Sequence, residues 1–141
     1  MLSQSMILSF EALNLWAILL AALSSFMLGG IWYSPVLFQK TWLEGCGLTE
    51  LDLQTSDPKM TFGMAFLLSL LASVFMAMVI APSFSLIGAT AFGAGVGICF
   101  VASALGISYI FEQRPLKLFL VNGGYHMLQF TLIAFVLRIM S

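Results

Sequence analysis

Three long stretches without Asp, Glu, Lys or Arg constrain the fold of this chain more than any other feature. They lie between residues 11 and 40, between 59 and 112, and between 117 and 138. A helix needs about 20 apolar residues to cross the hydrocarbon core of a bilayer, which is about 30 Å thick. Each stretch is long enough for at least one crossing, so the sequence predicts an integral membrane protein.

The composition agrees with this prediction and excludes some classes of protein. Hydrophobic residues make up 61% of the chain and charged residues only 8%, whereas a soluble domain carries about 25% charged residues. Five basic residues stand against six acidic ones. A nucleic-acid-binding surface needs a basic stripe, which the chain lacks.

The middle stretch is too long for one crossing and is interrupted at Ala81-Pro82-Ser83. Proline breaks a helix and also biases the residue before it away from helical geometry. We therefore predict one all-α transmembrane domain over residues 1–141, in which four helices form a bundle. The expected spans are residues 13–33, 61–80, 85–111 and 116–137.

The polar connection between the first two spans contains Thr49-Glu50-Leu51-Asp52, which has the spacing of a capping box. This pattern predicts a short amphipathic helix at the membrane surface. Asp57-Pro58 resembles an N-cap followed by proline at the first helical position, and Pro115 is expected to open the fourth span in the same way. The mixed charges of the connection indicate a solvated link without a ligand.

Orientation follows from lysine and arginine, which favour the cytoplasmic side. Four such residues fall in the first and third connections, and Arg138 alone lies at the opposite side. We therefore expect both termini to be non-cytoplasmic in a multi-pass protein of the bacterial inner membrane.

Small residues recur at every fourth position on three of the spans, and small residues let helices approach closely in lipid. Helix packing is the simplest interpretation, with Gly29, Ser69, Ser73, Gly93 and Gly97 as its principal positions. Three stripes also offer more packing faces than a monomer needs, which predicts a homo-oligomer in the lipid bilayer. The stripes are Ala17, Ala21, Ser25 and Gly29, then Ala65, Ser69, Ser73, Ala77 and Ala81, and then Ala89, Gly93 and Gly97.

Polar residues within the spans are concentrated on the fourth one, where Asn122, His126 and Gln129 share a helical face. If the first and fourth helices are neighbours, Asn122 and His126 should face Ser25 and Gly29. His126 has two interpretations. It is either a neutral side chain that bonds across helices, worth about 0.6 kcal/mol, or a ligand-facing group at the bilayer midplane.

Other chemistry has little support in the sequence. The spans contain no Asp or Glu for a proton-coupled antiporter, and two cysteines with one histidine do not form a zinc pattern. No nucleophile and base pair is visible. We therefore expect neither a catalytic site, nor a metal, nor a cofactor.

Five segments of the sequence form a recognisable pattern, which comprises Asn14 with Trp16, residues 29–42, residues 47–50, Arg114-Pro115 and residues 122–126. Together they resemble the bacterial membrane family catalogued as domain of unknown function 1761, over nearly the whole chain. The resemblance implies a small inner-membrane protein of a family without an assigned activity. Its most specific part is the exit from the first span through Trp32, Tyr33 and Pro35 to Trp42, whereas the third span departs from the pattern at Phe100. These aromatic residues form either a belt at the cytoplasmic interface or a binding cage.

Three functions are compatible with these features. An oligomer that binds or passes a small solute needs a wet cavity lined by the polar face of the fourth span. An accessory subunit that packs against another membrane protein needs an outward apolar face with small residues. A membrane enzyme is the least favoured, because it needs acidic or metal-binding residues near the interface.

Overall fold

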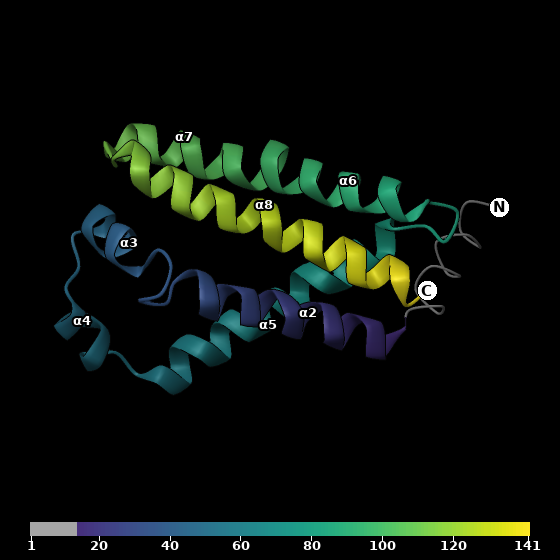
Figure 1. The fold of residues 1–141 in the computed structure, drawn as a ribbon, viewed down its shortest axis with the longest axis horizontal. Coiled ribbons are helices and arrows are strands. Elements are labelled where there is room, and N and C mark those ends of the chain that lie inside the picture. Colours follow the sequence, from purple (N-terminus) through teal and green to yellow (C-terminus); the bar gives the residue numbers. More distant parts are fainter. Residues whose placement is uncertain (1–13) are drawn as a thin grey trace.

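Four long helices form the structure, a computed structural model that describes residues 14–141 (Figure 1). Leu13, where the first span was expected to begin, lies outside the described residues. The first, second and fourth long helices are α2 (Leu15–Trp32), α5 (Pro58–Val79) and α8 (Leu116–Ile139). The third consists of α6 (Leu86–Val96), the π-helical segment η1 (Gly97–Ala102) and α7 (Ser103–Glu112). All four are long and apolar enough to cross a membrane, which confirms the predicted all-α four-helix bundle.

The helices begin where local chemistry favours it. The Asn14 side chain accepts a hydrogen bond from the backbone N–H of Ala17 at the start of α2, at 3.2 Å. Asp57 caps α5 with Pro58 at the first turn, as expected. Pro115 differs slightly from the expectation, because it is the N-cap residue and α8 begins one residue later.

The helix α8 is the centre of the bundle. It contacts α2 on one side and α6, η1 and α7 on another, while α5 packs mainly on α2. The end of the bundle that carries α3 and α4 is called the loop end here, and the opposite end is the terminal end (Figure 1). At the terminal end, the Asn14 side chain donates to the carbonyl of Met140 at 3.3 Å. Arg138 in turn donates to the carbonyl of Phe84 in the connection between α5 and α6.

The connection between α2 and α5 is more structured than a solvated link. It contains α3 (Gln39–Cys46) and α4 (Glu50–Thr55). The predicted capping box is present at α4, where Thr49 and Asp52 bond reciprocally. Leu43 and Gly45 of α3 are buried, and a Cβ on Gly45 would lie 2.9 Å from Cβ of Leu118 in α8. One side of α3 therefore packs on the bundle.

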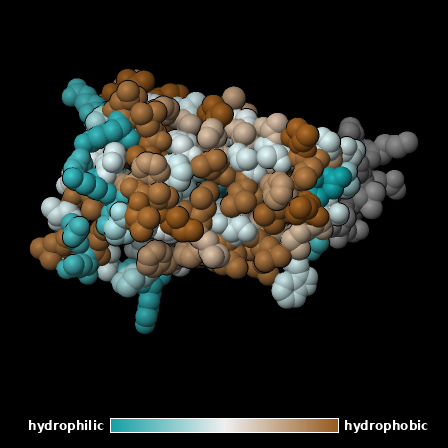
Figure 2. Space-filling view, in the orientation of Figure 1, coloured by the Kyte–Doolittle hydropathy of each residue, from teal (hydrophilic) through white to brown (hydrophobic). Residues whose placement is uncertain are grey.

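The hydropathy of the surface differs between the long helices and the loop end. Figure 2 shows hydrophobic residues over the long helices and a concentration of hydrophilic ones at the loop end. The exposed apolar side chains of α5 include Phe62, Leu67 and Phe75. In a bilayer such surface contacts lipid, so its exposure matches a membrane protein.

Two glycines of the third span lie at a close contact with α8 of the same chain. A Cβ on Gly93 would clash with the carbonyl oxygen of Phe130 and lie 2.6 Å from Cβ of Ala134. A Cβ on Gly97 would lie 2.6 Å from Cα of Met127. Both glycines thus allow backbone contact with α8, and they do not support the expected oligomer because the chain itself covers them.

The first two stripes are also partly buried within the chain. Ala17, Ala21 and Ser25 of α2 are almost inaccessible, and Gly29 lies under Tyr125 of α8. On α5, Ser69 and Ser73 are buried, and the Ser73 hydroxyl donates to the Ser69 carbonyl at 2.9 Å.

The π-helical segment corrects the expectation of one uninterrupted α-helix over residues 85–111. Its widened turns run from Gly97 to Ala102 beside α8. The Ser103 hydroxyl donates to the carbonyls of Cys99 and Phe100, at 2.5 and 3.3 Å. A side chain therefore supplies hydrogen bonds where the regular α-helical ladder is interrupted.

We expect Gly93→Ala to lower the free energy of unfolding by about 1–3 kcal/mol, because the added methyl group overpacks the contact with α8. Gly95→Ala is the matched control, since a Cβ there meets open space and alanine favours the helix. Thermal melts in one detergent would compare the two variants. Equal melting temperatures for both would contradict the packing assigned to Gly93.

Candidate functional site

Two hydrogen bonds join three long helices near the loop end. The Tyr33 hydroxyl, just after α2, donates to Oδ1 of Asn122 in α8 at 2.6 Å. Nδ2 of Asn122 donates to the Tyr109 hydroxyl of α7 at 2.7 Å. We call Tyr33, Asn122 and Tyr109 the aromatic–amide network. Its amide uses a donor and an acceptor at once, so one side chain holds α2 and α7 against α8.

The interfacial motif predicted from the sequence packs around this network. Trp32 donates its indole N–H to the Val121 carbonyl at 2.9 Å. The Tyr33 ring lies 5.2 Å from the Trp42 ring and 5.4 Å from the Tyr125 ring, measured between centroids. The rings thus fill the space between α2, α3 and α8 by contacting one another. Pro35 is exposed at the following turn.

Tyr125 makes the contact with α2 that the sequence analysis predicted for His126. The Tyr125 hydroxyl donates to the Ser25 carbonyl at 3.1 Å, and its oxygen would lie 2.9 Å from a Cβ on Gly29. The absence of a side chain on Gly29 therefore makes room for the ring. His126 does not face Ser25 and Gly29 as expected, because it is one residue further around α8.

His126 instead bonds along its own helix. Its Nδ1 lies 2.7 Å from Oε1 of Gln129, and its ring is 4.9 Å from that of Tyr125. The three residues expected on one face of α8 consequently divide into two groups. Asn122 belongs to the aromatic–amide network, whereas His126 and Gln129 form a pair nearer the middle of the helix.

Tyr109 and Tyr125 are the residues that the sequence analysis missed. The polar face expected from the sequence comprised Asn122, His126, Gln129 and Ser25, without either tyrosine. A usable signal for Tyr125 was present, since a large residue on one span faces glycine on another. Tyr109 had no comparable signal, because its bond to the Asn122 side chain depends on how α7 and α8 are rotated relative to each other.

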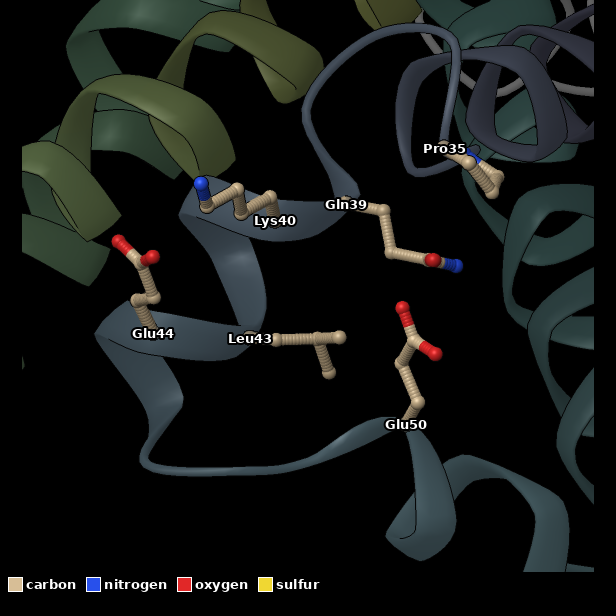
Figure 3. A pocket seen from close by; sticks show the side chains of 6 residues that line it. All are labelled: Pro35, Gln39, Lys40, Leu43, Glu44 and Glu50. Carbon is tan, nitrogen blue, oxygen red and sulfur yellow. The ribbon is translucent and has the colours of Figure 1, made fainter.

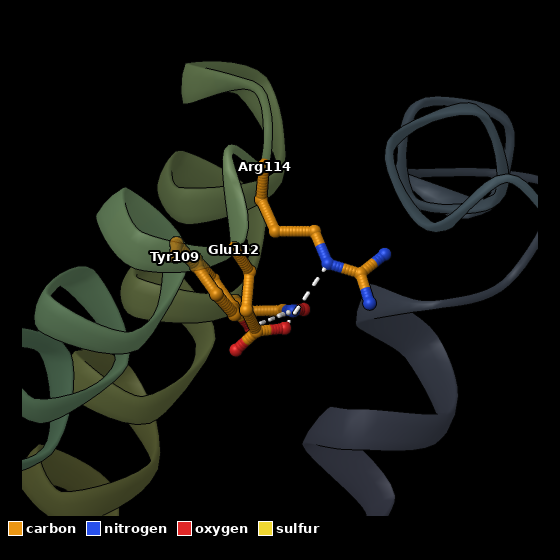
Figure 4. Close-up of polar contacts among 4 residues, drawn as sticks. Tyr109, Glu112 and Arg114 are labelled. Atoms are coloured by element: carbon orange, nitrogen blue, oxygen red, sulfur yellow. Dashed lines mark hydrogen bonds and ion pairs between the residues drawn. The ribbon is translucent and has the colours of Figure 1, made fainter.

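Ion pairs surround the network at the loop end. Figure 4 shows Tyr109 near Glu112 and Arg114, whose side chains form an ion pair at 3.3 Å. Lys117 of α8 pairs with Glu44 of α3 at 3.1 Å. The hydrogen bond from Lys117 and its positive charge hold the pKa of Glu44 below the ordinary value. Exposed pairs of this kind contribute little stability, and this one joins α3 to α8.

A hollow of about 390 Å³ opens between α3, α4 and the turn after α2. We call it the interfacial hollow. In Figure 3, the side chains of Gln39, Leu43 and Glu50 extend into a shared space, while Lys40 and Glu44 lie toward the other side of α3. Among residues 14–141, neither Lys40 nor Glu50 forms an ion pair. The lining residues are Pro35, Gln39, Lys40, Leu43, Glu44 and Glu50.

A second hollow of about 440 Å³ lies on the long helices and is almost wholly apolar. We call it the apolar groove. Its two threonines direct their hydroxyls to backbone carbonyls of their own helices, so the groove presents their methyl groups. Neither hollow includes His126. The apolar groove is lined by Leu86, Ile87, Thr90, Ala91, Ala94, Thr131 and Phe135.

Comparison with known proteins gives a family. The model of a family described as "Protein of unknown function (DUF1761)" matches residues 16–138. The chain belongs to this family. No curated protein and no solved structure was found to match it. The match confirms the resemblance seen in the sequence and covers the aromatic–amide network and the interfacial hollow of this DUF1761 protein.

We expect Asn122→Leu to lower the free energy of unfolding by about 1 kcal/mol, because it removes both interhelical bonds of the network and each is worth about 0.6 kcal/mol. Tyr109→Phe should cost about half as much, since it removes one bond. The double variant should be no less stable than Asn122→Leu. Additive losses in thermal melts would show that the two side chains act independently, contrary to the network.

The Glu44 pair should give stability a pH dependence. A lowered folded-state pKa means that the pair stabilises the fold above the unfolded pKa and loses this effect as pH falls through the folded one. The wild type should therefore melt above Glu44→Gln at pH 7, and the difference should vanish well below pH 4.5, the ordinary value. Salt at about 1 M should also remove it. A difference that does not shrink as pH falls below 4.5 would contradict the assignment.

Proposed function

We propose that this DUF1761 protein binds a small organic cation in the interfacial hollow, at the membrane surface. The observation that carries the proposal is the convergence of the Glu50 carboxylate and the Gln39 amide over the apolar side chain of Leu43 (Figure 3). A carboxylate and an amide oxygen accept hydrogen bonds from an ammonium group, while Leu43 and Pro35 suit its carbon chain. The hollow also falls within the usual range for ligand sites, about 300–1,000 Å³.

The packing of α3 against α8 supports a preformed binding site. Leu43 is 6% exposed, and its helix is held against α8 by the contact of Gly45 with Leu118 and by the Lys117–Glu44 pair. The wall of the hollow is therefore positioned by the bundle before a ligand arrives. Binding to a preformed wall avoids the entropic cost of ordering a loop.

The polar side chains of α8 favour binding of a solute at the membrane surface. They do not favour its passage through the bundle. Asn122 is bonded to Tyr33 and Tyr109, and Oε1 of Gln129 accepts a hydrogen bond from Nδ1 of His126. The Asn122 bonds clamp helices together and the His126–Gln129 pair lies along α8, while the glycine contacts of α6 and η1 close the adjoining space. The proposed function is therefore still the binding of a small solute, as expected from the sequence. The proposed site, however, is the interfacial hollow at the loop end and not the polar face of α8 at the bilayer midplane.

Orientation and location belong to the same proposal. The excess of lysine and arginine at the loop end favours a cytoplasmic position for the hollow, and the family resemblance favours a bacterial inner membrane. We further propose a non-catalytic protein, since the groups around the hollow match ligand binding better than they match a nucleophile with its base.

The second candidate is an accessory subunit, which the apolar groove favours. The groove places Ala91 and Ala94 beside the open face of Gly95, and small residues on an outward face suit a close helix partner. A homo-oligomer would use the same face. This function would leave the interfacial hollow without a role.

Ethanolamine is a suitable probe for the proposed site, with ethylene glycol as its neutral counterpart. We expect ethanolamine alone to bind the purified protein in isothermal titration. Glu50→Gln should weaken it about tenfold or more, since a hydrogen bond to a charged group is worth about 1.5–3 kcal/mol.

Glu112→Gln is the matched control, because it makes the same change of charge at the loop end but does not line the hollow. It should bind ethanolamine like the wild type. Equal weakening in both variants, or no heat with the wild type, would refute the site.

A further inference from the structure

We propose that the interfacial hollow selects a protonated primary or secondary amine, and that Gln39 is the residue that sets this selectivity. This rests on the proposed function and names the class of its organic cation. An ammonium of this class carries at least two N–H groups. A quaternary ammonium carries none, so the two kinds of cation need different surroundings in a protein.

The hollow has no aromatic ring among its described lining residues. Proteins bind quaternary ammonium groups against the faces of aromatic rings. The rings at the loop end contact one another instead. The Trp32 ring lies 4.6 Å from that of Phe38, measured between centroids. The Tyr33 ring lies 5.2 Å from that of Trp42. The aromatic residues that the sequence allowed to be a belt or a binding cage therefore form no cage around this hollow.

Two hydrogen-bond acceptors face each other across the hollow. Gln39 is the first residue of α3, and Glu50 is the first residue of α4. In Figure 3 the Gln39 amide and the Glu50 carboxylate extend toward each other. Within residues 14–141 neither side chain forms a hydrogen bond or an ion pair. The amide oxygen and the carboxylate can therefore each accept an N–H group from one ammonium placed between them.

The lysine of α3 does not take the place of this ligand. Lys40 extends to the other side of the helix in Figure 3, where its positive charge lowers the pKa of Glu44. Glu44 in turn pairs with Lys117 of α8. On the Leu43 side of the hollow, Glu50 is thus the carboxylate that remains for a ligand. One carboxylate and one amide suit a monovalent cation, whereas a calcium ion needs six or more oxygen ligands.

The number of N–H groups on the cation decides the order of affinities. A primary ammonium has three donors and a secondary ammonium has two, so each can bond to both Gln39 and Glu50. A tertiary ammonium can bond to only one of them, and a quaternary ammonium can bond to neither. Affinity should therefore be similar for the first two cations and should fall at each of the last two steps.

Isothermal titration of the full chain in detergent tests this order. The ligands are ethanolamine and its N-methyl, N,N-dimethyl and trimethyl derivatives, which share one carbon chain and one positive charge. We expect the N-methyl derivative to bind within about threefold of ethanolamine, because it keeps both bonds. The dimethyl derivative should bind about tenfold more weakly, and the trimethyl derivative about tenfold more weakly again, since each step removes a hydrogen bond from a charged donor.

Gln39→Leu tests the role of the amide. With one acceptor left, a single N–H group is enough, so ethanolamine should weaken to the affinity of the dimethyl derivative. The step between the N-methyl and dimethyl derivatives should disappear, while the step to the trimethyl derivative remains. Gln54→Leu is the matched control, because Gln54 lies on α4 but does not line the hollow. It should leave all four affinities unchanged, and melting temperatures should confirm that both variants fold.

The same ammonium occurs in soluble amines and in the headgroup of phosphatidylethanolamine. Titration of ethanolamine into the protein in phosphatidylcholine bilayers, with and without phosphatidylethanolamine, distinguishes these two sources. Phosphatidylcholine suits the host bilayer, because its quaternary headgroup should not compete. A loss of apparent affinity with phosphatidylethanolamine assigns the site to the lipid headgroup, and an unchanged affinity assigns it to a soluble amine. Either result supports selection of N–H donors.

Three results would overturn the inference. If the trimethyl derivative binds as tightly as ethanolamine, the selectivity is refuted, while the proposed binding of an organic cation stands. If Gln39→Leu keeps the step between the N-methyl and dimethyl derivatives, Gln39 does not set the selectivity. If none of the four ligands binds, the proposed function fails together with the inference.

Discussion

The close approach of α8 to helices on two sides is the contact on which the rest of the structure depends. On one side, Gly93 and Gly97 bring the backbone of the third span onto α8. On the other, Gly29 receives the ring of Tyr125. Apolar burial gives little driving force between helices in lipid, so such backbone contact and interhelical hydrogen bonds have to supply the stability. The central position of α8 follows from its contacts on both sides.

The hydrogen bonds between the helices depend on this close packing. Asn122 can reach Tyr33 and Tyr109 because the glycine contacts set the spacing of α2 and α7 from α8. Polar groups in hydrocarbon are costly without a partner, and each of these finds one on a neighbouring helix. The bundle is thereby clamped at the loop end, and this clamp provides the support on which α3 lies.

The interfacial hollow is a consequence of that support. Glu44 and Gly45 face α8, while Gln39 and Leu43 lie on the side of α3 that α4 approaches. A charged residue at the start of α4 then completes the hollow. A connection that the charge pattern alone indicated to be a solvated link thus encloses the interfacial hollow.

The sequence by itself determined the four spans, the capped starts of α4 and α5, and the family, because these depend on local chemistry and on runs of apolar residues. It also placed Asn122, His126 and Gln129 on α8, since helical periodicity gives the angle between residues of one helix. Only the tertiary structure decided that Tyr125 rather than His126 meets Ser25, that Tyr109 completes the network, and that the glycine stripe of the third span is covered within the chain. The physical reason is that periodicity leaves the rotation of each helix about its own axis undetermined. That rotation is set by the fit of large side chains such as Tyr125 over glycines such as Gly29, which exists only once the helices have packed.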